Sequence, residues 1–278
     1  MEKTYIVNGQ VYLDHRFAQA TVGMEAGKLR VLPPDCPTAD GTVFDASGMK
    51  LVPGFIDTHT HGAVGVDVNG ATAEDLEKIS CFMASRGTTA WQCSILTDTR
   101  EQTEWCIGEF KRHEKMEQNG ADLVGIHLEG PFLAKEYKGA MPEHLLKKND
   151  LELVRHYQTL AEGKINYITI SPELEGVQEM IPALVEMGIV VGIGHSGATY
   201  DQAMRAIGLG ATVGWGLVSI WGIVACAGAA GCAAHPASRQ SPMARAARWS
   251  NTRGFFIRAY SGSTSCGLPS ASAARVTV

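Results

Sequence analysis

The hydrophobic and polar positions divide the chain into two regions of different periodicity. Short runs rich in β-branched and apolar side chains lie at residues 4–7, 10–13, 21–25, 28–31 and 42–45. Turn residues such as Asn8-Gly9 and Gly27 separate them, and Asn-Gly between two β-prone runs signals a tight turn. Residues 1–50 therefore predict a small β structure, with a loop over 33–40.

After residue 50, apolar β-rich runs alternate with amphipathic segments. The β-rich runs are 51–56, 88–95, 123–127, 165–170, 189–193 and 211–213. Segments with apolar residues at helical spacing lie between them, at 73–86, 100–118, 153–160, 176–186 and 200–209. Such alternation indicates βαβ units and a parallel sheet, and largely apolar strands are typical of a sheet covered on both faces. Residues 51–213 therefore predict strands 1–6 of an incomplete (β/α)8 TIM-type barrel, in the α/β class.

Three of the predicted strands end in side chains that bind metals. His59 and His61 are two positions apart on an extended chain, so their side chains point the same way. Glu129 ends an apolar run before a Gly-Pro turn, where a carboxylate can ligate one cation or bridge two. His195 ends another apolar strand, beside glycines that allow close backbone approach. Because functional groups gather at the C-terminal ends of barrel strands, these four residues predict a site for zinc or a similar divalent ion.

Each of these residues also has an interpretation without a metal. Taken alone, His59 and His61 would be surface histidines in a loop, and Glu129 a solvated carboxylate. The coincidence of three strand ends favours the metal site. His127 shares a strand face with Glu129 and could orient a ligand, but we interpret it as a hydrogen-bonded core histidine.

Several short motifs are similar to those of one enzyme family. His-x-His-Gly at 59–62 is similar to the amidohydrolase superfamily as a whole. More specific segments resemble N-acetylglucosamine-6-phosphate deacetylases: Val-Pro-Gly-Phe-Ile-Asp at 52–57, His-Leu-Glu-Gly-Pro-Phe at 127–132, Lys-Gly-Ala at 138–140 and Gly-His-Ser-Gly-Ala-Thr at 194–199. The resemblance covers residues 1–213.

The resemblance implies a fold, a reaction and site residues. The fold would be a (β/α)8 barrel with a small β-sandwich from both chain ends, to which residues 1–50 contribute. The reaction would convert N-acetylglucosamine 6-phosphate to glucosamine 6-phosphate and acetate with one or two divalent ions. Glu129 and His195 would be constant metal ligands, and His59 and His61 would hold a second ion. Ala140 would contact the substrate, next to Met141, where many members carry histidine or glutamine.

The last part of the chain departs from this pattern. The family would continue after residue 213 with another metal-binding histidine and, later, a catalytic aspartate. No Asp or Glu follows Asp201, so no catalytic residue is assigned. Residues 214–278 contain six arginines but no lysine and no acid, whereas residues 1–213 contain all 29 acids. We therefore hypothesise a reading-frame shift near codon 213, assign no domain to 214–278, and expect this tail to pack poorly.

Charge, cysteines and hydropathy limit the other classes of function. The net charge of −5 argues against a nucleic-acid partner. The N-terminus lacks a signal-like apolar stretch, and the seven scattered cysteines indicate reduced thiols, so we expect a cytoplasmic protein. The uncharged stretch 214–234 is nominally long enough to span a bilayer, but its many Gly and Ala residues argue against membrane insertion. A homodimer is expected only from the resemblance.

Three functional hypotheses follow from the sequence. The first is the sugar-phosphate deacetylase that the resemblance implies. The second is a catalytically inactive, truncated barrel that retains part of a metal site, which the missing acid favours. The third is another amidohydrolase, dihydroorotase-like or deaminase-like, against which the His-Leu-Glu-Gly-Pro segment argues.

Overall fold

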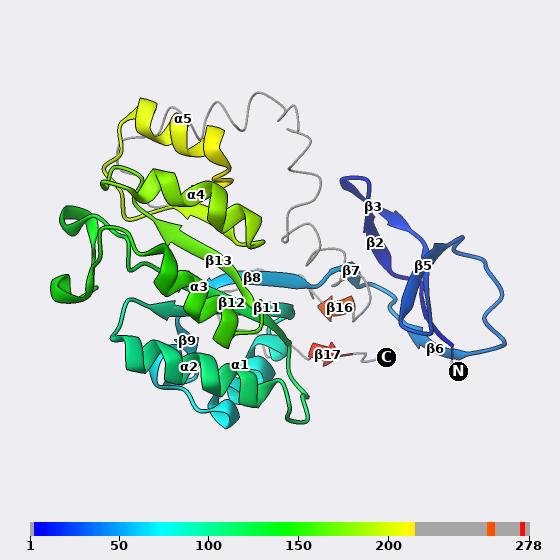
Figure 1. The fold of residues 1–278 in the computed structure, drawn as a ribbon. Coiled ribbons are helices and arrows are strands. Elements are labelled where there is room, and N and C mark those ends of the chain that lie inside the picture. The colour runs from blue at the N-terminus through cyan, green and yellow to red at the C-terminus, as the bar shows by residue number, and fades with distance from the viewer. Residues whose placement is uncertain (1–2, 215–254, 259–272, 276–278) are drawn as a thin grey trace, which may run out of the picture.

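A computed structural model describes residues 3–214 with their side chains, together with the backbone of 255–258 and 273–275. These residues form a small β domain and a larger α/β domain, which lie side by side and are joined through residues 50–60 (Figure 1). The predicted fold class is confirmed: the larger domain is an incomplete barrel, preceded by a small N-terminal β domain.

The small domain consists of two sheets. One has the order β5-β4-β1-β6 and the other β17-β16-β7-β2-β3. Its strands are β1 (Thr4–Val7), β2 (Gln10–Leu13), β3 (Arg16–Gln19), β4 (Thr21–Glu25), β5 (Lys28–Leu32), β6 (Thr42–Asp45), β7 (Lys50–Pro53), β16 (Phe255–Arg258) and β17 (Ala273–Arg275). Ile6 and Val22 from the first sheet share a buried cluster with Val11 and Leu51 from the second. The core therefore lies between the sheets.

The boundary between the two domains lies at Gly54. We expected 51–56 to be one strand of the barrel, but the structure divides it into β7 and β8 (Phe55–Thr60). Leu51 is buried in the small domain's core, so β7 belongs to that domain. A Cβ atom at Gly54 would collide with the side chain of Thr89, and the missing side chain lets the chain pass close to the next barrel strand.

Two short segments of the tail differ from our expectation. The backbone of β16 pairs antiparallel with both β7 and β17. We assigned no domain to residues 214–278 and expected them to pack poorly. An unpaired strand edge offers a ladder of backbone donors and acceptors to any extended segment, so β7 can recruit a strand without a regular sequence pattern. The rest of the tail prediction lies outside the described residues.

The larger domain is built around a curled parallel sheet of the order β15-β14-β13-β12-β11-β8 (Figure 1). Its strands after β8 are β11 (Thr88–Leu96), β12 (Asp122–Glu129), β13 (Ile165–Ile170), β14 (Val190–Ile193) and β15 (Val213–Gly214). A small hairpin of β9 (Gly62–Ala63) and β10 (Val66–Asp67) follows β8. The six predicted strand regions thus form one sheet, in sequence order.

One α-helix lies between each pair of consecutive strands of the parallel sheet. They are α1 (Ala73–Ser85), α2 (Arg100–His113), α3 (Leu151–Leu160), α4 (Val177–Glu186) and α5 (Tyr200–Leu209), with the short helices η1 (Val68–Gly70), η2 (Lys135–Tyr137) and η3 (Glu143–Leu145). Thr72 and Thr199 cap α1 and α5 with reciprocal capping boxes, which satisfy the free backbone donors of the first turn. The α2 helix ends at His113, before the predicted residue 118.

The sheet has open edges within the described part of the chain. β8 and β15 each pair with one strand only. On β8, Phe55 is 61% exposed and Ile56 is 36% exposed, whereas β13 and β14 are almost wholly buried. A complete barrel removes such edges. The exposed apolar side chains of β8 therefore mark the side on which the barrel is incomplete.

The structure bears on the expectations about membrane insertion and about the cysteines. Among the described residues, no helix combines the length and the apolar character that crossing a bilayer requires. The stretch 214–234 lies outside those residues except for Gly214. Cys93 and Cys106 are buried, Cys36 is half-buried and Cys81 is exposed, and all four are free thiols. Burial raises the thiol pKa of Cys106 to about 12, which makes this residue chemically inert.

Glu77 on α1 supports a pH-dependent prediction about stability. One carboxylate oxygen accepts hydrogen bonds from the backbone N–H groups of Asn119 and Gly120, and the other lies 2.9 Å from Nε2 of buried His113. Burial raises the pKa of Glu77, but these hydrogen bonds outweigh it and leave the pKa below its ordinary value.

A carboxyl with a lowered folded-state pKa stabilises the fold above its unfolded-state pKa and loses this effect as the pH falls through the folded-state value. Glu77→Gln is therefore expected to lower the free energy of unfolding by about 1 kcal/mol at pH 7. The difference from the unsubstituted chain should shrink below the ordinary glutamate pKa of about 4.3. Urea denaturation at several pH values measures this, and a difference that does not depend on pH would contradict it.

Candidate metal centre

The four predicted ligands lie at the C-terminal ends of three parallel strands. His59 is on β8, and His61 follows its last residue. Glu129 is the last residue of β12, and His195 comes two residues after β14. Parallel strands bring their carboxyl ends to one edge of the sheet. The structure thus brings all four side chains to one place, with Glu129 in the centre.

Donor atoms of His59, His61 and Glu129 lie close enough together to bind one metal ion. Nε2 of His59 lies 3.1 Å from Nε2 of His61 and 3.4 Å from Oε2 of Glu129. Nε2 of His61 lies 2.7 Å from the same oxygen. Zinc bonds of about 2.0–2.2 Å at tetrahedral angles place neighbouring ligand atoms about 3.3 Å apart. The three atoms are therefore spaced closely enough for one ion, and the nitrogen and oxygen donors suit a divalent transition metal.

Glu129 also connects this group to His195. Nε2 of His195 lies 2.7 Å from Oε1 of Glu129, the oxygen that does not face His59 and His61. The Glu129 side chain is only 3% exposed. A buried carboxylate that has histidine nitrogens beside both of its oxygens can bridge two cations or ligate one. The Glu129 carboxylate thus links His195 to His59 and His61.

Backbone carbonyls orient two of the imidazole rings. Nδ1 of His61 lies 3.0 Å from the carbonyl oxygen of Ser94, and Nδ1 of His195 lies 2.6 Å from that of Tyr137. A carbonyl can only accept a hydrogen bond, so each Nδ1 carries the proton. Nε2 donates its own proton to Glu129 when the ring is protonated, and it would offer its lone pair to a metal ion when that proton is lost. This arrangement is typical of histidines that bind metals through Nε2.

The charge of Glu129 dominates the electrostatics of the site. Burial raises the pKa of Glu129, but hydrogen bonds with His195, His59 and His61 outweigh burial and hold its pKa far below the usual range. Burial lowers the pKa of His61, but Glu129 more than compensates and raises it. The hydrogen bond with Glu129 likewise raises the pKa of His195, against the effect of burial. The site therefore holds an ionised carboxylate ready to attract cations.

His127 lies beneath the site and has both ring nitrogens engaged. Nδ1 is 2.8 Å from Oγ of Ser94, and Nε2 is 2.8 Å from Oγ1 of Thr169. The ring stacks on Tyr167 and meets the edge of the His59 ring. Burial keeps the pKa of His127 well below its ordinary value. These contacts agree with our interpretation of a core histidine, and they also place its ring as a support under His59.

The loop that follows β12 lies against His195. Gly139 is at a positive φ of 60°, and a Cβ atom there would lie 3.1 Å from Cε1 of His195. Ala140, the predicted substrate contact, is exposed on the turn that follows, whereas Met141 is buried. Ala140 is therefore the residue after the one that lies against His195, and it is open to solvent.

Sequence reasoning missed the polar residues that support the ligands. Ser94 contributes its carbonyl to His61 and its hydroxyl to His127, and its hydroxyl also accepts a hydrogen bond from the backbone of Thr60. Ser171 and Glu173 follow the end of β13 and contact the His195 loop. Their positions were the only signal in the sequence: Ser94 lies near the end of β11, and Ser171 and Glu173 follow the end of β13.

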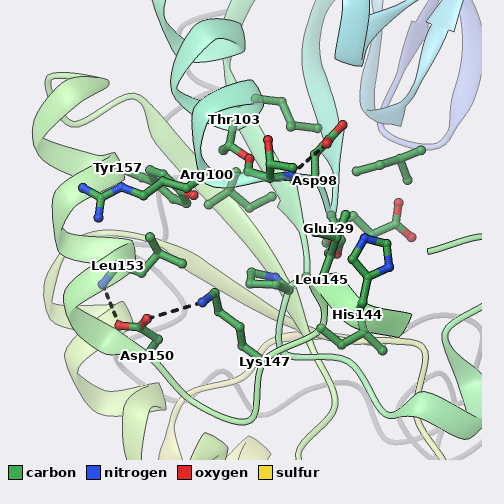
Figure 2. Close-up of a pocket in the computed structure, with 18 residues that line it drawn as sticks. Asp98, Arg100, Thr103, Glu129, His144, Leu145, Lys147, Asp150, Leu153 and Tyr157 are labelled. Atoms are coloured by element: carbon green, nitrogen blue, oxygen red, sulfur yellow. Dashed lines mark hydrogen bonds and ion pairs between the residues drawn. The ribbon is translucent and has the colours of Figure 1, made fainter. Parts of the chain in front are cut away.

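A separate cavity of about 330 Å³ lies beside the end of β12, between α2, α3 and the loop before α3 (Figure 2). Glu129 is the one predicted ligand among its lining residues. Its charged groups already have partners, since Arg100 pairs with Glu104 and Lys147 lies 4.0 Å from Asp150. The donor atoms that converge at Glu129 identify the candidate site better than this hollow does.

Comparison with known proteins shows which proteins this chain is similar to. No family model matches the chain. The chain is 31% identical over 199 residues to an N-acetylglucosamine-6-phosphate deacetylase of Lysinibacillus sphaericus, covering 72% of this chain and 51% of the relative. It is 35% identical over 176 residues to the Homo sapiens protein of that name, covering 60% and 42%. The resemblance to N-acetylglucosamine-6-phosphate deacetylases is confirmed.

Solved structures agree with the sequence relatives. The N-acetylglucosamine-6-phosphate deacetylase of Pasteurella multocida matches with a TM-score of 0.70 and 28% identity, over 76% of this chain and 56% of that protein. A Mycobacterium smegmatis deacetylase, solved as an Asp-to-Ala mutant with N-acetyl-D-glucosamine-6-phosphate, also matches with a TM-score of 0.70. This chain spans about half the length of the curated deacetylases it matches.

Proposed function

We propose that His59, His61, Glu129 and His195 hold one or two divalent metal ions, with zinc as the expected metal. The proposed reaction is hydrolysis of the N-acetyl group of an amino-sugar phosphate such as N-acetylglucosamine 6-phosphate. One observation carries this proposal: three histidine nitrogens from two strand ends meet the two oxygens of buried Glu129 at the end of a third strand. The deacetylase relatives favour this reaction over a dihydroorotase-like or deaminase-like one.

Each part of the site has a defined task in that reaction. A bound divalent ion would lower the pKa of a water ligand toward about 7 and polarise the amide carbonyl. Glu129 supplies the negative charge that holds the ion. Ser94 and Tyr137 fix the rings of His61 and His195 through their carbonyls. The exposed turn at Ala140 is the proposed substrate contact.

Metal titration of the 278-residue chain tests this proposal. We expect the purified protein to take up zinc or cobalt in a stoichiometry of one or two ions. Cobalt bound to nitrogen and oxygen ligands should show visible absorption, and zinc should displace it. Failure to take up either ion under conditions in which the chain is folded would overturn the proposed metal centre.

A second candidate function is metal binding without turnover. The observation that favours it is the absence of any Asp or Glu after Asp201, because the proposed hydrolysis needs a carboxylate to take the proton of the attacking water. We propose that a reading-frame shift near codon 213 removed this acid. The other two frames of the encoding DNA should then restore a later aspartate, and frames without one would refute the shift.

The remaining expectations belong to the same proposal. The partner is a small amino-sugar phosphate, without nucleic acid or membrane. A homodimer is expected from the resemblance, and a cytoplasmic location from the scattered cysteines and the N-terminal sequence.

A further inference from the structure

We propose that Ser171 and Glu173 position His195 for metal binding. This inference rests on the proposed metal centre, and it assigns to the end of β13 a role that its residue types alone do not suggest. Both residues follow the strand that lies between the Glu129 strand and the His195 strand. Their side chains contact residues 195–197 of the His195 loop.

Ser171 connects the loops that follow β12 and β14. Its hydroxyl lies 2.6 Å from the carbonyl oxygen of His195 and accepts a hydrogen bond of 2.8 Å from the backbone N–H of Ala134. Its own N–H donates to the carbonyl of Phe132. Ser171 is completely buried. One hydroxyl therefore fixes the backbone of a metal ligand relative to the loop that carries Tyr137.

Glu173 holds the next two residues of the His195 loop. One carboxylate oxygen accepts a hydrogen bond of 2.6 Å from the hydroxyl of buried Ser196, and the other accepts one of 2.7 Å from the N–H of Gly197. The Ser196 hydroxyl in turn accepts from the N–H of Ala198. The carboxylate thus replaces the strand ladder at the point where β14 has ended.

The backbone of His195 needs this support. Its φ of 50° lies in the left-handed region, which residues with a Cβ atom seldom adopt unless the surroundings impose it. In this conformation Nδ1 donates to the Tyr137 carbonyl and Nε2 faces Glu129. Gly197 also lies so close to the Tyr137 ring that a Cβ atom there would collide with it. Without Glu173, the loop would lose two acceptors and could relax to a negative φ, which would turn the His195 ring away from Glu129.

Three substitutions in the full 278-residue protein test the proposal. Glu173→Ala removes both acceptors. Glu173→Gln keeps an oxygen for the Gly197 N–H and an amide that can donate to Ser196. Glu175→Ala is the matched control, because Glu175 lies in the same turn and its exposed carboxylate pairs with Lys148 on the surface.

Zinc and cobalt dissociation constants are the first measurement. We expect Glu173→Ala to weaken metal binding about 10- to 100-fold, as loss of a group that orients a ligand does. Glu173→Gln should restore most of the affinity, and Glu175→Ala should leave it unchanged. If Glu173→Ala does not fold, Ser196→Ala, which removes one hydrogen bond to Glu173, should weaken binding in the same direction.

The ring nitrogens of His195 supply a second measurement that needs no metal. In the metal-free protein, ¹⁵N NMR should show His195 protonated at Nδ1, and Glu173→Ala should shift this signal while Glu175→Ala does not. If the unsubstituted chain binds no metal, the proposed metal centre fails, but this signal still tests the positioning role. Unchanged metal affinity together with an unchanged His195 signal in Glu173→Ala would overturn the inference.

Discussion

Glu129→Gln is expected to weaken binding of a divalent ion to this chain by more than about 100-fold, the upper value for losing a group that only orients a ligand. The amide keeps the size of the side chain but removes its charge, and it replaces one carboxylate oxygen with an NH2 group that can only donate hydrogen bonds. Both oxygens of Glu129 are used, one toward His59 and His61 and one toward His195. One substitution therefore removes the shared centre of the site. Isothermal titration with zinc measures the effect.

Glu143→Gln is the matched control for this substitution. Glu143 lies in the loop after β12, where its exposed carboxylate pairs with Lys135. Its replacement should leave metal affinity unchanged, since exposed ion pairs contribute little. Equal zinc affinity in Glu129→Gln and Glu143→Gln would place the metal elsewhere, and the candidate site would be wrong.

Trp91→Ala is expected to lower the free energy of unfolding by about 3–5 kcal/mol. Trp91 lies on β11 and is completely buried in the core of the larger domain. Its indole Nε1–H donates a hydrogen bond of 2.8 Å to the hydroxyl of Ser80 on α1. Removing the ring leaves a large cavity and a buried hydroxyl without this partner. Since domains are stable by only about 5–15 kcal/mol, much of the folded population could be lost.

Trp105→Ala tests whether burial is the cause. Trp105 on α2 is 39% exposed, so its loss should cost clearly less than that of Trp91. Urea denaturation followed by circular dichroism compares the two variants with the unsubstituted chain. Similar losses of stability in both variants would show that the β11–α1 contact is not a centre of the core.

Much of the larger domain follows from local sequence pattern. The periodicity of 165–170 and 200–209 predicts β13 and α5 with the bounds that the structure shows. The local pattern fails to predict strand bounds where contacts with neighbouring elements determine them. Gly54 interrupts an apolar run because the backbone must pass close to Thr89. Arg16–Gln19 becomes β3 although it is mostly exposed, because β2 pairs with it through the backbone.

The candidate metal ligands could be predicted because histidine and glutamate at strand ends are informative residue types. His59, His61, Glu129 and His195 converge as their positions suggested. Ser171 and Glu173 could not be assigned a role in the same way. Serine and glutamate are common after strands, and only the structure shows that both residues hydrogen-bond to the His195 loop and that Ser171 is buried.

The candidate metal ligands and the residues expected for catalysis lie in different parts of the chain. The ligands lie within the first 195 residues, on strands that form a continuous sheet. The sequence after Asp201 supplies no carboxylate for proton transfer. Metal binding and catalysis are therefore expected to separate in this protein, although they belong together in the proposed reaction.

Acetate release from N-acetylglucosamine 6-phosphate is the most direct test of that separation. The measurement uses the purified 278-residue chain after loading with zinc, and compares it with the same chain treated with a chelator and with Glu129→Gln. We expect the loaded chain to hold metal but to release no more acetate than either control. Metal-dependent acetate release that Glu129→Gln abolishes would contradict it, because the chain would then possess a proton-transfer group that its sequence after Asp201 does not provide.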